Sequence, residues 1–208
     1  MNETQVVIGL AMALIIGIWL MVYLLDGNKL TNKLLKALQQ NLDVELVQRK
    51  YFWQSNYLTG ELRGFPVKIF EYSRSQESMP IAIRITLPKQ IFNFSINKKA
   101  KLNFTKPDVL TGISQIDQHY LFKTTDIAET QRFLDNQEVL QALNRYTINF
   151  KASDAIEVHR QYLYYFFPST NITKKRKARF MQAVNFSLLF AHQLTQYSDN
   201  TGKSSSNP

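Results

Sequence analysis

Residues 81–87 read IAIRITL, in which branched apolar residues alternate with small or polar ones. Successive side chains of a β-strand point to opposite faces, so Ile81, Ile83 and Ile85 would share one face and Arg84 would lie on the other. Such alternation is typical of a strand in an antiparallel sheet that has one face on a core and the other in water. We therefore predict a half-buried sheet around this strand.

The same alternation recurs on both sides of this strand. It extends over residues 46–125 and includes FNFSIN at 92–97, which predicts a run of about four to six strands. YTINFK at 146–151 and IEVHRQYLYYFF at 156–167 alternate in the same way. These two segments predict further strands, with a turn between them.

Two short helices are predicted between these strand regions, in DIAETQRFL and DNQEVLQAL. Each begins with Asp and has Glu three residues later, as in Asp126 with Glu129 and Asp135 with Glu138. This is the spacing of a capping box, in which two side chains satisfy free backbone N–H groups at a helix start. A last helix, about 174–197, is apolar on most sides and is expected to cover the sheet. The predicted fold class is α+β, an antiparallel sheet covered by a few helices that include a long C-terminal one.

The segment before the sheet, residues 6–25, reads VVIGLAMALIIGIWLMVYLL and contains no charged side chain. A helix of about twenty residues spans roughly 30 Å, which matches the hydrocarbon core of a bilayer. Residues 1–5 contain no Lys or Arg, and the run ends at Asp26 without a small-residue cleavage site, unlike a secretory signal peptide. We therefore predict a single transmembrane helix that is retained in the mature protein.

Basic residues follow this helix and none precedes it, since Lys29, Lys33 and Lys36 come soon after it. By the positive-inside rule, the N-terminus lies outside and the rest of the chain lies in the cytoplasm, at the inner membrane of a bacterium. The same lysines would contact anionic lipid headgroups. The expected division is a short outer terminus (1–5), the transmembrane helix (6–25), a juxtamembrane amphipathic helix (26–44), a cytoplasmic α+β domain (45–197) and a flexible tail (198–208).

Gly9, Ala13 and Gly17 are spaced by four and share one face of the predicted transmembrane helix. Small residues at this spacing let two membrane helices approach closely, because lipid supplies no hydrophobic drive for their association. The alternative is that small residues occur there by chance. This face is a candidate contact with another membrane protein or with a second copy of the chain.

The sequence KKRKAR at the start of the last helix contributes Lys174, Lys175, Arg176, Lys177 and Arg179. The positive end of the helix dipole disfavours cations there, by about 0.3–1 kcal/mol at exposed sites. Three interpretations stay open: contact with anionic lipid, binding of single-stranded nucleic acid with the help of nearby aromatic residues, or a solvated end without a partner. The formal net charge of +9 fits either anionic partner.

No motif in the sequence identifies a reaction. The chain has no Cys, which excludes disulfides, thiol catalysis and Cys-ligated metals. Its three His have no supporting residues at metal-ligand spacing, so we expect neither a metal nor a cofactor. An enzyme site, if there is one, is predicted around Asp108, Asp117 and His119. Asp117 and His119 are two apart at the expected start of a strand, where both would face one side.

Two stretches, LTGELRGFPVKI and DVLTGISQIDQHYLFKTTD, resemble an uncharacterised group of bacterial proteins in which membrane segments precede an α+β domain. The matching residues are Gly60, Glu61, Gly64, Val67, Thr111, Gly112, Asp117 and Tyr120. The resemblance implies this domain arrangement over about residues 45–195, and it implies no particular activity. Ile113 stands where the group usually has Asp, which weakens the case for a carboxylate site. Asp117 is therefore expected to hydrogen-bond the backbone of the glycine turn.

The function favoured by these observations is that of a membrane-anchored, non-catalytic interaction or scaffold protein, an accessory subunit of a larger complex. Its expected partners are the lipid bilayer and other membrane proteins. The alternatives are a membrane-anchored enzyme of unknown reaction and a nucleic-acid-binding domain tethered to the membrane.

Overall fold

The computed structural model describes residues 9, 12–18, 33–48, 55–72, 81–99, 106–147, 154–167 and 173–204 of the 208-residue chain. A helix covers residues 33–39. The elements that follow it are β1 (Glu45–Val47), β2 (Tyr57–Leu62), β3 (Phe65–Glu71), β4 (Ile81–Thr86), β5 (Phe94–Lys98), α2 (Ser114–His119), β6 (Tyr120–Thr124), α3 (Ile127–Leu134), α4 (Gln137–Thr147), β7 (Ala155–His159), β8 (Tyr162–Phe167) and α5 (Lys174–Ser204).

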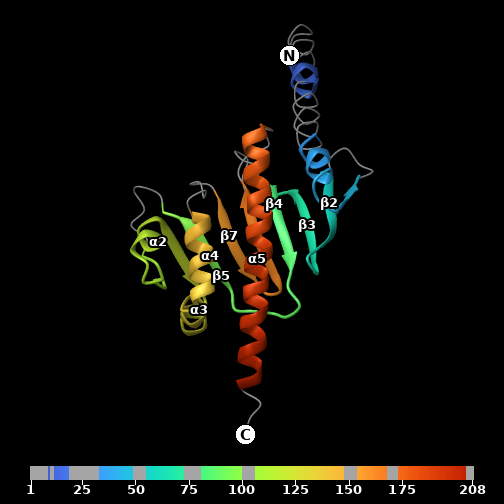
Figure 1. The fold of residues 1–208 in the computed structure, drawn as a ribbon. Coiled ribbons are helices and arrows are strands. Elements are labelled where there is room, and N and C mark those ends of the chain that lie inside the picture. Colours follow the sequence, from blue (N-terminus) through green and yellow to red (C-terminus); the bar gives the residue numbers. More distant parts are fainter. Residues whose placement is uncertain are drawn as a thin grey trace.

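The strands form one 8-stranded antiparallel sheet in the order β1-β2-β3-β4-β8-β7-β5-β6 (Figure 1). Strands β1 to β4 follow chain order. The late hairpin β7–β8 then lies between β4 and β5, so that segments far apart in the sequence meet in the middle of the sheet. The sheet is therefore not the simple meander that the period of two suggests.

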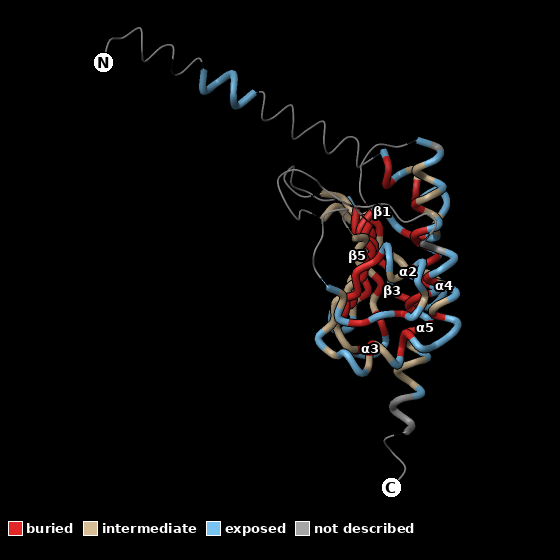
Figure 2. Tube along the Cα trace, turned by 90° about the vertical axis from the view of Figure 1, so that its left-hand side faces the viewer, coloured by how far each residue is buried: buried red, intermediate tan, exposed pale blue. Residues whose placement is uncertain are grey.

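The helices from α2 to α5 lie on one face of the sheet (Figures 1 and 2). Side chains on that face form the main core, in which Ile69, Ile83 and Ile85 are 0% exposed. Arg84 lies on the opposite face, as the alternation in IAIRITL predicts. The predicted fold class, α+β with an antiparallel sheet and a long C-terminal helix, is confirmed.

Helix α5 crosses the middle of the sheet and packs on β4 and β8. Its Phe190 is fully buried and meets Phe133 of α3 and Phe94 of β5, with ring centroids 5.5 and 6.1 Å away. Aromatic pairs at such separations add to the free energy gained from burial alone. This cluster joins the long helix to the far half of the sheet.

The C-terminal helix is longer than the sequence predicts. It was expected to end near residue 197 and to give way to a tail, but it continues to Ser204. Asp199 in this extension pairs with Lys89, which follows β4, at 2.5 Å. Both side chains are well exposed, so this ion pair contributes little stability.

The predicted turn between Gly60 and Gly64 is tighter than expected. Gly60 belongs to β2, and the turn is made by Arg63 and Gly64, whose φ angles are +52° and +82°. Gly60 is needed for another reason, because a Cβ there would lie 3.1 Å from the Asp43 carbonyl oxygen and from the Val44 Cα. The chain entering β1 packs closely over this glycine.

The predicted start of a strand near Asp117 and His119 is wrong. Residues Ser114–His119 form helix α2, and β6 begins only at Tyr120. Gly112, with φ of +75°, turns the chain into this helix. The two candidate side chains therefore do not share a strand face.

Both predicted short helices form. Asp126 caps α3 by accepting a hydrogen bond from the Glu129 backbone N–H at 3.0 Å, as predicted. At the start of α4, Asn136 rather than Asp135 plays this part, since its Oδ1 accepts from the Glu138 N–H at 2.9 Å. The spacing located this cap to within one residue.

Much of the N-terminal prediction falls on residues outside the described ranges. Within 6–25, only Gly9 and residues 12–18 are described, and they are helical. In the described parts of the chain, no helix has the length and apolar character needed to cross a membrane. Residues 148–151 of the strand predicted in YTINFK also lie outside the description, and the two residues before them end α4.

Candidate functional site

Two basic segments lie at one end of the body, by which we mean the sheet with its covering helices. The helix over residues 33–39 lies at this end, and α5 begins there (Figure 1). Of the predicted basic residues there, Lys33, Lys36 and Lys175 are exposed, and Arg176 and Lys177 are half-buried. Lys29 lies outside the described residues, and for Lys174 only the backbone is described.

Arg179 does not belong to this basic surface, contrary to the sequence prediction. Its guanidinium pairs with Asp154, whose side chain is 0% exposed, and it stacks over the Phe167 ring at 4.6 Å. The Tyr165 hydroxyl donates to the same carboxylate at 3.0 Å. The helical period turns Arg179 toward the sheet, where it fastens α5 to the residue before β7. Sequence reasoning missed Asp154 because the partners are 25 residues apart.

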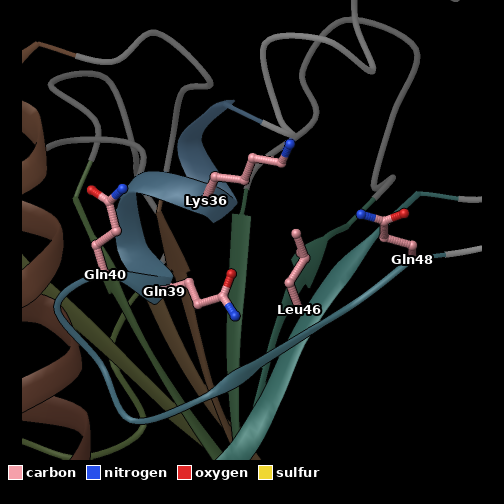
Figure 3. A pocket seen from close by; sticks show the side chains of 5 residues that line it. All are labelled: Lys36, Gln39, Gln40, Leu46 and Gln48. Atoms are coloured by element: carbon pink, nitrogen blue, oxygen red, sulfur yellow. The ribbon is translucent and has the colours of Figure 1, made fainter.

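A pocket of about 460 Å³ lies between the helix over residues 33–39 and strand β1 (Figure 3). It is lined by Lys36, Gln39, Gln40, Leu46 and Gln48. Lys36 and Gln39 extend from the helix toward β1, and Leu46 and Gln48 face them from the β1 side (Figure 3). One cation and several amides therefore surround a small apolar floor.

The helix periodicity explains why these polar groups line the pocket. Leu34, Leu35 and Leu38 are at most 5% exposed and belong to the main core, which leaves Lys33 and Lys36 on the outer side. An ammonium group beside amide donors suits an anionic group such as a lipid phosphate. Among the described residues that line the pocket, Lys36 is the one charged side chain, and three amides accompany it.

The Asp117 carboxylate holds a loop, as expected from the sequence. Its Oδ1 accepts hydrogen bonds from the Thr111 backbone N–H and hydroxyl, both at 2.9 Å, and its Oδ2 accepts from the Gly112 N–H at 3.0 Å. The exposed His119 places its Nδ1 2.9 Å from the Gln115 carbonyl oxygen. Both side chains thus have structural partners within or next to α2.

Asp108 is turned toward β6 and is also engaged. Its Oδ1 accepts from Lys123 Nζ at 2.8 Å and its Oδ2 from the Thr124 N–H at 3.0 Å. The hydrogen bond from Lys123 and the one from Thr124 lower the pKa of Asp108. The group is therefore ionised at neutral pH and poorly suited to general acid catalysis. No group of His, Asp and Glu suited to a metal ion occurs within the described residues.

A wider groove of about 860 Å³ runs between α4 and α5. Its lining includes Gln193, which is 7% exposed and donates from Nε2 to Glu138 Oε2 at 2.9 Å. The Gln193 Oε1 is buried without a hydrogen-bond partner in the described residues. Sequence reasoning missed this groove, since it depends on how two helices far apart in the chain pack.

The small-residue face of the N-terminal segment is open in the structure. Gly9, Ala13 and Gly17 are exposed, and among the described residues nothing beyond the helix's own nearby backbone lies within 4 Å of a Cβ placed on either glycine. The role of this face in helix association stays a prediction.

Comparisons with known proteins leave the family open. No protein-family model matches the chain, and no curated protein matches it. Among solved structures, the chain is similar to the crystal structure of the mycobacterial trehalose monomycolate transport factor A, TtfA. The match has a TM-score of 0.55 at 10% sequence identity and covers 80% of this chain and 93% of that one. At this identity the similarity concerns the fold alone.

The buried ion pair gives a direct test of the distinction between Arg179, which is paired beneath the helix, and the exposed basic residues at the same end. Replacing Arg179 with Leu would leave a buried carboxylate without its cation, at a cost of about 3–5 kcal/mol in the free energy of unfolding. Lys175→Leu, one turn earlier at the start of α5 where the side chain is exposed, is expected to change it by less than about 0.5 kcal/mol. Urea unfolding of the full chain in detergent measures both, and equal effects would contradict the assignment.

Proposed function

We propose that this chain is a single-pass membrane protein whose body acts as a non-catalytic accessory or scaffold module beside the bilayer. The observation that carries the proposal is the N-terminal segment, of which residues 12–18 form a helix that lies away from the body (Figure 2). Its large apolar side chains are 55–65% exposed, at Met12, Leu14, Ile15, Ile16 and Ile18. Such a continuous apolar surface in water is costly, and lipid is the medium that would cover it.

The basic end of the body supports this proposal. It lies at the end of the body nearer to residues 12–18 (Figure 1). The cytoplasmic leaflet carries negative charge and attracts nearby Lys and Arg, at about 1 kcal/mol per residue. We propose that Lys33, Lys36 and Lys175 face the headgroups, that the chain is oriented with its N-terminus outside, and that the pocket at Lys36 receives a lipid phosphate.

The fold similarity supports an accessory role more than a catalytic one. The solved neighbour is named as a factor in the transport of trehalose monomycolate. We propose the same general role for this chain, as an assistant to a membrane transport assembly in a bacterium, without carrying over the cargo. The structural engagement of Asp108, Asp117 and His119 also supports a non-catalytic function.

Cell fractionation tests the anchor and its orientation. The full chain is expected to stay in the membrane fraction after alkaline carbonate washing, because an inserted apolar helix is not extracted by charge or pH. Protease added outside spheroplasts is expected to leave the body intact and to digest it once the membrane is opened. Recovery in the soluble extract, or digestion from outside, would contradict the proposal.

Lysine labelling tests whether the basic end faces lipid. In nanodiscs, Lys33, Lys36 and Lys175 are expected to be acetylated about fivefold more slowly with phosphatidylglycerol than with phosphatidylcholine alone, because anionic headgroups hold each ammonium. Lys89 is the matched control, since its side chain is 59% exposed and pairs with Asp199 near the far end of α5. Mass spectrometry gives the rates. Equal slowing of Lys89, or no slowing at Lys36, would contradict the placement.

A further inference from the structure

The second face of the sheet carries no described helix. Helices α2 to α5 and the helix over residues 33–39 all contribute to the core on the first face (Figure 2). On the second face, the strand register places Lys68 of β3 directly opposite Arg84 of β4, and Arg84 directly opposite Tyr164 of β8. Like charges at directly opposed positions destabilise a sheet, so the groups around this pair affect its stability.

Aromatic rings surround the two cations. Lys68 Nζ lies 4.0 Å from the centroid of the Tyr57 ring, and Arg84 Cζ lies 4.9 Å from that of Tyr162. Tyr164 stacks on Phe166 with the centroids 6.0 Å apart. Aromatic faces attract cations, and these rings also fix the positions of the two basic heads on this face of the sheet.

More aromatic residues lie on the same face two positions along each strand. Phe70, Ala82 and Phe166 lie opposite one another across β3, β4 and β8, and Tyr72 packs against Phe166 at 5.1 Å. These residues form a second, smaller apolar cluster on this face. Tyr, Phe and Arg grouped in this way are typical of the energetically dominant residues of protein interfaces.

Arg84 has an unmet hydrogen-bond donor. Its Nε is buried and has no hydrogen-bond partner among the residues that the structure describes. A carboxylate at the Nε–Nη edge of the guanidinium would accept from this N–H in the bidentate geometry that arginine favours. It would also offset the repulsion between Arg84 and Lys68.

The charges around the pair disfavour a polyanion. The register places Glu45, Glu61 and Glu157 on the same face as Lys68 and Arg84. A nucleic-acid strand or an anionic membrane laid over this face would meet these carboxylates as well as the two cations. A partner that presents one carboxylate surrounded by apolar side chains fits this arrangement of charges better.

We infer that this face, centred on Arg84, is the docking surface for a partner protein that presents one Asp or Glu beside aromatic or aliphatic side chains. The carboxylate binds Arg84 next to Lys68, and the apolar residues pack on the half-buried rings of Tyr164, Phe70 and Tyr72. The inference rests on the proposed accessory role, for which it supplies the partner's chemistry. It does not depend on the membrane anchor.

Selection from a phage-displayed library of short random peptides tests the inference, with the full chain in detergent as the target. The selected peptides are expected to share an acidic residue next to an aromatic or aliphatic one. Synthetic versions should lose about tenfold in affinity when that acid is replaced by its amide, and about tenfold on the variant Arg84→Gln. Lys175→Gln, at the basic end, is the matched control and should bind as the unchanged chain does.

The variant Arg84→Lys separates a loss of binding from a loss of folding. It keeps the charge and most of the side-chain packing but lacks the planar guanidinium. It is expected to bind several-fold more weakly than the unchanged chain, with the same thermal unfolding midpoint. Glu77→Gln tests the chain's own acidic residue between β3 and β4 as the occupant. A rise in peptide affinity on that change would overturn the inference.

Four other results would also overturn it: selected peptides without an acidic residue, equal affinity for Arg84→Gln and the unchanged chain, or Arg84-dependent binding of oligothymidylate or of phosphatidylglycerol vesicles in place of peptides. Failure of the peptide test while the chain remains in washed membranes would remove this docking surface and leave the anchor proposal standing. Loss of the chain from the membranes while peptide binding persists would remove the anchor proposal and leave this docking surface standing.

Discussion

The arrangement of this protein depends on one long helix buried against one face of an antiparallel sheet. Helix α5 lies across β4 and β8, where the two halves of the chain meet, and Phe190 joins it to α3 and β5. The ion pair between Arg179 and Asp154 fixes its first turns against the start of β7. Because the described helices lie on one face, the aromatic and basic residues of the other face belong to the strands themselves.

The direction in which α5 runs across the sheet also determines where the basic residues gather. Since α5 begins at the end of the body that holds the helix over residues 33–39, the basic residues of both segments share that end (Figure 1). A basic end next to an apolar N-terminal segment suits a body held at an anionic membrane surface. The surface that we infer to bind a partner protein is the second face of the sheet, where Lys68 and Arg84 lie among aromatic rings.

Local patterns predicted the parts of this fold that local forces determine. The alternation in IAIRITL gave the inner face of β4, and the spacing of Asp126 and Glu129 gave the start of α3. Side-chain period tells which face a residue occupies but not which strand lies beside it, so the place of β7–β8 between β4 and β5 was not predictable. Arg179 was wrongly assigned to the surface for a related reason: a run of basic residues looks uniform in sequence, whereas a helix turns its members in different directions.

The central claim is that the N-terminal apolar helix lies in lipid with the body beside it. The chain has no Cys, so a single spin label at Ile15→Cys reports on one position in the full chain reconstituted in vesicles. The account predicts frequent collisions of that label with oxygen, which partitions into the hydrocarbon core, and few with a water-soluble nickel chelate. A label at Lys175→Cys should show the opposite preference, and nickel collisions as frequent at residue 15 as at residue 175 would contradict the account.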